Sequence, residues 1–293
     1  MKAIDLGHFL PVLLGDSKEV SGMAEKVGFI GLGDMGLPMA KRVVTHGYEV
    51  TACDVRREPV EEIKKLGAKE VKSPEEVALA SDVTITMVRD DAQSREVIFG
   101  PNGVMEGARE GSGIIMMSTL SPAFCRKVGE AGRAKGIHVL DAPVTGTRMR
   151  AETGELGIIV GGEKELVEKY RPILETMGKI IYCGDLGSGE VVKLANNMAL
   201  LINLCACHEA ISWGIKNGAS EEVLVELMKE GTGNSWVVQN WHYVKPMMEA
   251  VPSPWGIPIK DLSLAIDIAN QIEYPVPFTA LASQLIRRLG TES

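Results

Sequence analysis

The sequence predicts an α/β fold, in which a doubly wound sheet is followed by an all-α C-terminal domain joined to it by one long helix. Three observations favour this fold. Short apolar runs alternate with helical segments as far as about residue 184. The first of these runs ends in a glycine-rich turn. Residues 190–216 then have the pattern of a single helix without proline, and no strand pattern follows them.

The glycine-rich turn follows a short apolar run at residues 27–30, which is typical of a buried parallel strand. Gly31, Gly33 and Gly36 have the spacing G-x-G-x-x-G, and Met35 lies in the same turn. In such turns the first glycine permits a tight bend, the second lets a pyrophosphate approach, and the third lets helix and strand pack closely. The spacing favours a Rossmann-type dinucleotide site at these four residues over an ordinary strand–turn–helix.

The next expected strand, residues 48–53, ends at Asp54, which lies 18 positions after Gly36. An acidic residue at about this distance binds the ribose hydroxyls of the dinucleotide. Asp54 favours NAD over NADP, because a carboxylate repels a 2′-phosphate. Arg56 and Arg57 leave NADP open, since either guanidinium could accommodate that phosphate, although both could equally be solvated loop residues.

The remaining pattern divides the chain into three parts. Residues 1–23 are expected to be an N-terminal extension, residues 24–186 the dinucleotide-binding domain, and residues 187–293 an all-helical substrate and dimerisation domain. Further strands are expected at residues 70–71, 82–88, 113–117, 136–140, 156–160 and 179–182. Helices are expected at residues 59–66, 121–135, 221–230, 236–249, 260–271 and 278–289, with another opening at Ser73.

Composition narrows the class of protein. The 293 residues carry a net charge of −8, which disfavours nucleic acid or an anionic membrane as a partner. No apolar run approaches the roughly 20 residues that a membrane-spanning helix needs. The five cysteines form no C-x-x-C pair, as expected for reduced thiols in a cytoplasmic enzyme, and no metal site is expected.

The long helix carries the residues most suited to proton transfer. Lys193 and Asn197 are four positions apart and therefore share one face, on a helix that is otherwise mostly apolar. Burial disfavours the ammonium form of a lysine, which makes the amine a usable proton donor or acceptor near neutral pH. The alternative is that Lys193 extends along the helix start into solvent.

Five motifs occur in order along the chain. They are Gly31-x-Gly-x-x-Gly36, Ser118-Thr-x-Ser-Pro122, Asp141-Ala-Pro-Val-Thr-Gly146, Gly189-x-x-x-Lys193-x-x-x-Asn197 and Lys260-Asp261-Leu262. Over about residues 24–290, together they resemble the β-hydroxyacid dehydrogenase family.

The resemblance implies a role for each motif. It implies that Lys193 is the general acid/base and that Asn197 orients the substrate. It also implies that the substrate is bound by Ser118, Thr145 and Gly146. It implies that the cofactor is contacted by Val88, Thr119 and Lys260. Asp141 is expected to anchor its loop by hydrogen bonds.

Thr147 and Arg148 depart from the family pattern, which usually has a second glycine and then a non-basic residue there. Arg148 and Arg150 are expected in a loop beside the substrate, where they would recognise an additional anionic or polar group. The sequence thus predicts an NAD(P)-dependent oxidoreductase that interconverts a small anionic hydroxy acid and its semialdehyde or keto form, acting as a homodimer or homotetramer. The alternatives are an imine reductase-like enzyme and a non-catalytic nucleotide-binding protein.

Overall fold

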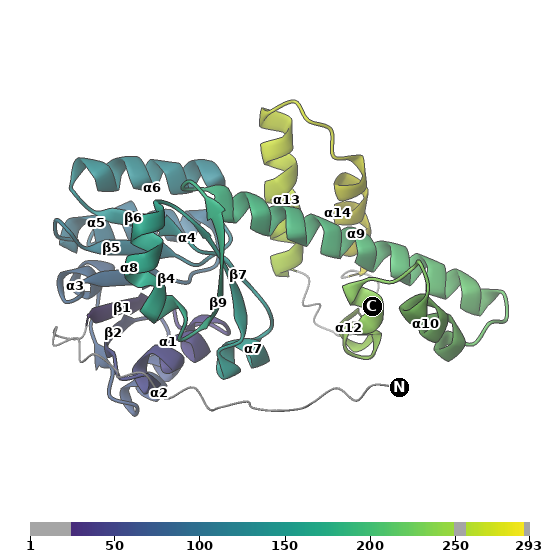
Figure 1. The fold of residues 1–293 in the computed structure, drawn as a ribbon, viewed down its shortest axis with the longest axis horizontal. Helices are drawn as coiled ribbons and strands as arrows, with labels where there is room; N and C mark the ends of the chain where they lie inside the picture. The colour runs from purple at the N-terminus through teal and green to yellow at the C-terminus, as the bar shows by residue number, and fades with distance from the viewer. Residues whose placement is uncertain (1–24, 249–255, 290–293) are drawn as a thin grey trace, which may run out of the picture.

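A computed structural model describes residues 25–248 and 256–289 of the chain (Figure 1). The predicted extension at residues 1–23 lies outside the described residues. The strands are β1 (Lys26–Ile30), β2 (Glu49–Cys53), β3 (Lys69–Glu70), β4 (Val83–Thr86), β5 (Gly113–Met116), β6 (His138–Asp141), β7 (Val144–Thr145), β8 (Leu156–Gly161) and β9 (Gly178–Gly184).

The helices of the sheet domain are α1 (Gly36–Thr45), α2 (Arg57–Lys64), α3 (Pro74–Leu79), α4 (Asp91–Phe99), α5 (Val104–Gly107), α6 (Pro122–Ala134), α7 (Arg148–Thr153) and α8 (Lys164–Leu174). Those that follow are α9 (Ser188–Lys216), α10 (Glu221–Glu230), α11 (Trp236–Gln239), α12 (Trp241–Met248), α13 (Gly256–Gln271) and α14 (Pro277–Leu289). The expected helix at residues 236–249 is therefore two helices, separated at Asn240.

The sheet has the strand order β3-β2-β1-β4-β5-β6-β8-β7, and β9 pairs with β8. Strands β1 to β6 pair in parallel, in the order common to dinucleotide-binding folds, so the predicted fold class is confirmed. The antiparallel pairs that β8 makes with β6 and β7 were not predicted. Strand β9 pairs with β8 and ends at Gly184, four positions before α9 begins at Ser188, so this part of the sheet leads into the helix.

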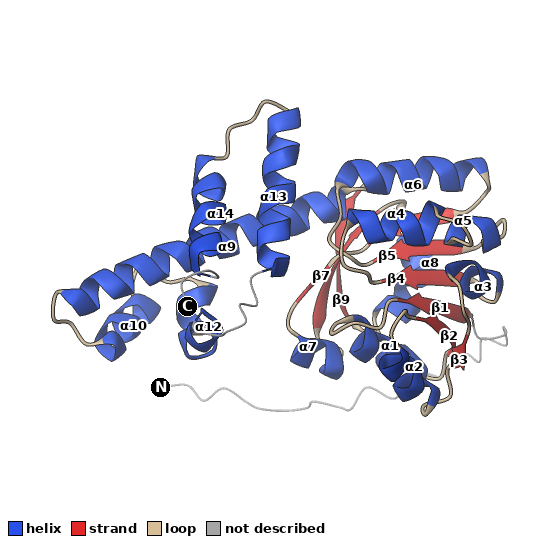
Figure 2. Ribbon diagram, turned by 180° about the vertical axis from the view of Figure 1, so that it is seen from behind, coloured by secondary structure: helices blue, strands red, loops and turns tan. Residues whose placement is uncertain are grey.

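Helices cover both faces of the sheet, as a doubly wound fold requires (Figures 1 and 2). One apolar core joins the sheet to α1, α2 and α8, and includes Met39, Ile63 and Tyr170. A second core on the other face joins it to α3, α4, α5 and α6, and includes Val77 and Phe124. With the two faces of the central strands covered, a ligand is expected at the carboxyl ends of the strands.

The C-terminal part of the described chain is all helical and is built on α9. In Figure 1 this helix runs away from the sheet, with α13 and α14 crossing it and α10 beside its far end. A third apolar core, which includes Leu204, Ile211, Trp241 and Ile286, holds these helices together. The start of α9 packs on β8 and β9, so this helix belongs to both halves of the molecule.

Helix α9 is also long and apolar enough, by length and composition alone, to cross a membrane. This differs from the expectation that no such segment exists, because a hydropathy average over 18 residues tolerates isolated polar and charged residues. The core helix of a soluble protein passes the same test. In this structure α9 is the helix on which the other C-terminal helices pack.

Candidate active site at the junction of sheet and helices

The glycine-rich turn between β1 and α1 has the packing that a dinucleotide needs. Gly31 has a φ of +91°, and a Cβ atom there would lie 2.3 Å from the carbonyl oxygen of Met87. A Cβ atom at Gly36 would lie 2.0 Å from the carbonyl oxygen of Gly31. At Gly33 the nearest described neighbour is a guanidinium nitrogen at 3.8 Å. The outer glycines thus serve internal packing, while Gly33 and the helix start at Met35 leave backbone open to a pyrophosphate.

Asp54 follows β2, and its carboxylate lies against the same turn. Its Oδ2 accepts the backbone N–H of Leu32 at 2.6 Å, and its Oδ1 accepts the backbone N–H of Arg56 at 2.8 Å. Burial raises the pKa of Asp54, but these bonds and the Arg56 guanidinium outweigh it and lower the pKa below its usual value. Arg56 also donates from Nη2 to the carbonyl of Leu32 at 2.9 Å. An ionised carboxylate and a guanidinium therefore lie side by side where the ribose is expected.

The carboxyl ends of β4 and β5 meet at one edge of the sheet. The hydroxyl of Ser118, which is buried, accepts the N–H of Val88 at 2.8 Å. The next carbonyl, that of Thr119, accepts a hydrogen bond of 2.7 Å from Nζ of Lys260. Lys260 lies on α13, so the helical domain contacts the sheet at the residues predicted to bind substrate and cofactor. We call this contact region the junction; it comprises Ser118, Thr119, Lys193, Asn197, Lys260 and Asp261.

Asp141 ties the end of β6 to the start of α9. Its Oδ1 accepts the N–H of Gly187 at 2.6 Å, and its Oδ2 accepts the N–H of Glu190 at 2.9 Å. Burial raises the pKa of this carboxyl group, and the N–H donors oppose that rise. A carboxylate at a helix N-terminus also interacts favourably with the helix dipole. Asp141 is therefore an anchor that fixes the direction in which α9 leaves the sheet, as its loop position indicated.

Lys193 is buried at the junction, with only 8% of its surface exposed. The alternative in which it extends into solvent is not observed. In the described part of the chain its amine has no hydrogen-bond or ion-pair partner. Burial is the largest cause and lowers the pKa of Lys193; the Asp261 carboxylate opposes this, as Glu190 does when it is ionised, and Lys260 lowers the pKa further. The amine is thus desolvated and unpaired, which are the conditions that bring a lysine toward neutral-pH proton transfer.

Asn197 lies one turn after Lys193 on α9 and is held by a residue from α13. Its Nδ2 donates to Oδ2 of Asp261 at 2.7 Å, and both side chains are buried. The other oxygen of Asp261 lies 3.1 Å from Nζ of Lys260. With its Nδ2 engaged in this way, the amide group of Asn197 has a fixed orientation.

Thr145 and Gly146 lie at the end of β7, where Thr145 pairs with Gly157 of β8. Gly146 has a φ of +135°, a conformation that favours glycine. The loop expected to carry Arg148 and Arg150 is in fact the short helix α7, so that prediction was wrong. Gly154, in the left-handed conformation, ends this helix.

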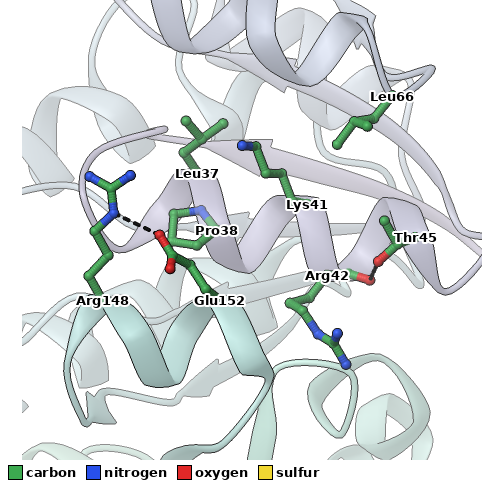
Figure 3. A pocket seen from close by; sticks show the side chains of 8 residues that line it. All are labelled: Leu37, Pro38, Lys41, Arg42, Thr45, Leu66, Arg148 and Glu152. Atoms are coloured by element: carbon green, nitrogen blue, oxygen red, sulfur yellow. Dashed lines mark hydrogen bonds and ion pairs between the residues drawn. The ribbon is translucent and has the colours of Figure 1, made fainter.

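Arg148 lies in a groove between α1 and α7 (Figure 3). Its Nε donates to Glu152 at 2.9 Å, four residues later on the same helix. Figure 3 shows the pair beside Leu37 and Pro38, with Lys41 farther along α1. A role of Arg148 in substrate recognition stays a prediction.

Two buried acids were given no role by the sequence analysis: Asp261 at the junction, and Glu190 in the first turn of α9. Asp261 stood in a quoted motif without a role, and Glu190 was not singled out. The contact between Asp261 and Asn197 joins positions 64 residues apart, which no local pattern reveals. Within the described residues, no group of three His, Cys, Asp or Glu side chains is placed to hold a metal ion.

Comparison with known proteins decides the family. Residues 26–184 match the family described as the NAD binding domain of 6-phosphogluconate dehydrogenase. Residues 187–293 match the NAD-binding family of NADP-dependent 3-hydroxyisobutyrate dehydrogenase. The chain belongs to the β-hydroxyacid dehydrogenase family. As a β-hydroxyacid dehydrogenase it is an NAD(P)-dependent oxidoreductase. The glycine-rich turn and Asp54 lie within the matched NAD-binding region, residues 26–184.

Individual relatives of this β-hydroxyacid dehydrogenase cover most of its length. The mitochondrial 3-hydroxyisobutyrate dehydrogenase of Mus musculus is 35% identical over 91% of this chain and 83% of its own. The 2-(hydroxymethyl)glutarate dehydrogenase of Eubacterium barkeri is 35% identical over 89% of this chain and 87% of its own.

Among solved structures, 3-hydroxyisobutyrate dehydrogenase of Mycobacterium tuberculosis with L-serine has a TM-score of 0.82 at 30% identity, covering 92% of this chain and 95% of that one. An imine reductase from Myxococcus stipitatus is 20% identical, with a TM-score of 0.67, over 91% of this chain and 93% of that one. At that identity the likeness shows the fold alone.

Proposed function

We propose that this β-hydroxyacid dehydrogenase interconverts a small anionic hydroxy acid and its semialdehyde or keto form, with Lys193 as the general acid/base. Ser118, Thr145, Gly146 and Asn197 would bind the substrate. Val88, Thr119 and Lys260 would bind the nicotinamide end of the cofactor, and the glycine-rich turn its pyrophosphate. When bound, the nicotinamide supplies the hydride-transfer chemistry.

The chain's own residues supply the proton and the geometry. In oxidation, neutral Lys193 would take the proton of the substrate hydroxyl group. In reduction, its ammonium form would return a proton to the developing alkoxide. Asn197, held by Asp261, would orient the oxygen that exchanges this proton. Lys260 would keep the helical domain against Thr119, which excludes water from the reacting groups.

One observation carries this proposal: Lys193 is a residue only 8% exposed, and among residues 25–248 and 256–289 its amine has no hydrogen-bond or ion-pair partner. A structural lysine that is this buried would normally be paired, because an unpaired ammonium in a dry site is costly. The free amine is therefore best explained by a partner that arrives with the substrate.

The test is Lys193→Ala, with Lys216→Ala as a matched control from the exposed end of the same helix. General acid/base catalysis contributes about 10²- to 10⁴-fold, so kcat of Lys193→Ala should fall by about that factor while cofactor affinity stays the same. Lys216→Ala should behave as wild type. Turnover of Lys193→Ala within about threefold of wild type would refute the role of Lys193.

The substrate class is tested by a spectrophotometric screen of hydroxy acids and semialdehydes with NAD and NADP, including cyclic imines. Oxidation of a hydroxy acid supports the proposal. Reduction of imines alone would establish the imine reductase alternative, and no turnover with any acid would revive the non-catalytic one.

A further inference from the structure

Glu190 is a buried acid that the proposed reaction does not use. It lies in the first turn of α9, three positions before Lys193 and therefore on the same face. Its exposed fraction is 0%. The backbone N–H of Leu120, the residue after Ser118 and Thr119, donates to its carboxyl group. Glu190 thus connects the start of the catalytic helix to the loop predicted to bind substrate and cofactor.

The two carboxyl oxygens of Glu190 have few donors around them. Oε1 lies 3.9 Å from the thiol of Cys125, a weak donor. Oε2 is fully buried and has no hydrogen-bond partner in the described part of the chain. An ionised carboxylate needs several donors or a cation to be stable without water. The surroundings of Glu190 therefore fit a neutral carboxylic acid.

The charges that face Glu190 favour the same protonation state. The titratable groups around it are Cys125 on α6, Asp141 at the end of β6, Lys193 on α9, and Lys260 and Asp261 on α13. Burial raises the pKa of Glu190 well above its usual value; Asp141 and Asp261 raise it further, while the Leu120 N–H and Lys260 oppose them. A third carboxylate among these acids would be repelled by the other two.

The protonation state of Glu190 matters for Lys193. An ionised glutamate one turn away would stabilise the ammonium form of Lys193 and hold it in a buried ion pair. A neutral carboxyl group still accepts the N–H of Leu120 but does not bind the lysine proton. Oxidation of a hydroxy acid requires a lysine that is free to accept a proton.

We propose that Glu190 is a positioning residue of this reaction, protonated in the working enzyme, which holds the Ser118–Leu120 loop without adding a charge that would fix the proton on Lys193. The proposal rests on the proposed function for its effect on Lys193. The protonation of Glu190 itself is independent of that function and is tested separately.

The first experiment measures urea unfolding of wild type, Glu190→Gln and the control Glu209→Gln as a function of pH. Glu209 is an exposed glutamate on the same helix. Above about pH 4.3 an unfolded chain releases the Glu190 proton, whereas the folded enzyme keeps it, so folding takes up a proton. The unfolding constant of wild type should therefore rise about tenfold per pH unit relative to Glu190→Gln. Parallel curves for wild type and Glu190→Gln would overturn the proposal.

Infrared spectroscopy reports the protonation state of Glu190 directly in the wild-type enzyme, so it can be used even if Glu190→Gln does not fold. A protonated buried carboxyl group has a C=O stretch separate from the carboxylate bands, and it shifts in D2O. We expect this band at neutral pH. Its absence would overturn the proposal, and so would its persistence in a folded Glu190→Gln protein.

The second experiment measures the pH dependence of kcat/KM for oxidation. Because the residue at 190 is already neutral, Glu190→Gln should keep the pH midpoint of the Lys193 limb. A midpoint lower by one unit or more would mean that Glu190 is ionised, which overturns the proposal. Glu190→Leu is also neutral but cannot accept the Leu120 N–H, so its kcat/KM should be about tenfold below that of Glu190→Gln. Equal values for these two variants would refute the positioning role.

Failure of the two proposals is distinguishable. If Lys193→Ala turned over normally, the proposed function would fail, yet the unfolding curves and the carboxyl band would still report on Glu190. If Lys193→Ala were inactive while Glu190 proved ionised, only this further inference would fail.

Discussion

Replacing Asp261 by asparagine should lower the pH at which the enzyme oxidises its substrate. Asp261 is buried, and its carboxylate is bound to Asn197, the residue one turn after Lys193. The Asp261 carboxylate acts on Lys193 and raises its pKa. We take about 6 Å as an order-of-magnitude separation of the two charges, the Cβ spacing of side chains four positions apart on a helix. At an effective dielectric constant of about 20, two unit charges about 6 Å apart interact by about 2.8 kcal/mol. This corresponds to about two pKa units.

The neighbouring cation reduces this effect. Nζ of Lys260 lies 3.1 Å from the second oxygen of Asp261 and offsets part of the negative charge. We therefore expect Asp261→Asn to lower the pKa of Lys193 by about one unit. Because oxidation needs the neutral amine, the rising limb of the kcat/KM profile should move to lower pH by the same amount. The amide oxygen can still accept the bond from Asn197, so the orientation of that side chain is retained.

The assay is the initial rate of NAD(P)H formation across pH, with Asp267→Asn as the control. Asp267 is an exposed acid on the same helix, and its removal should leave the profile in place. A profile of Asp261→Asn that coincides with wild type, or moves to higher pH, would show that Asp261 does not stabilise the lysine proton. The rising limb of the kcat/KM profile would then have to be assigned to a group other than Lys193.

Two further predictions concern specificity. Asp54→Asn removes a carboxylate that repels a 2′-phosphate, so the ratio of kcat/KM for NADP to that for NAD should rise about tenfold, equivalent to about 1.4 kcal/mol; an unchanged ratio would mean that Arg56 alone decides the preference. Arg148→Ala should raise KM for the true substrate about tenfold if the guanidinium binds an additional anionic group. Equal KM values for wild type and Arg148→Ala over a panel of acids would instead limit Arg148 to its ion pair in the α1–α7 groove.

The parts of the fold that could be predicted are those with a local cause. The turn at Gly31 and Gly36 could be predicted because neighbouring backbone atoms lie too close to these positions for any side chain. Only glycine fits there. A parallel strand such as β5, Gly113–Met116, was readable because both of its faces are buried, so that it carries no polar side chain. Ser121 and Pro122 marked the start of α6 by the bond from the Phe124 N–H to the serine hydroxyl.

The parts that escaped prediction have causes distant in the sequence. β7 is two residues long and shows no alternation, so its antiparallel pairing with β8 depends on the neighbouring strand. Helix α7 has six residues, and its first arginines looked like loop residues because a helix this short has no apolar period. The signal that could have revealed it is the spacing of Arg148 and Glu152 ahead of Gly154.

The chemistry of Lys193 follows the same division. The sequence could predict that Lys193 lies on a helix and shares one face of it with Asn197, because a lysine four positions from an asparagine on an apolar helix is a local pattern. What sets its proton affinity is not local: Asp261 and Lys260 come from α13, about 70 residues later. The buried position of the amine also depends on Asp141, which fixes α9 against the sheet. A sequence pattern can therefore indicate a candidate proton carrier, but the pKa of that candidate depends on groups that only the folded chain brings to it.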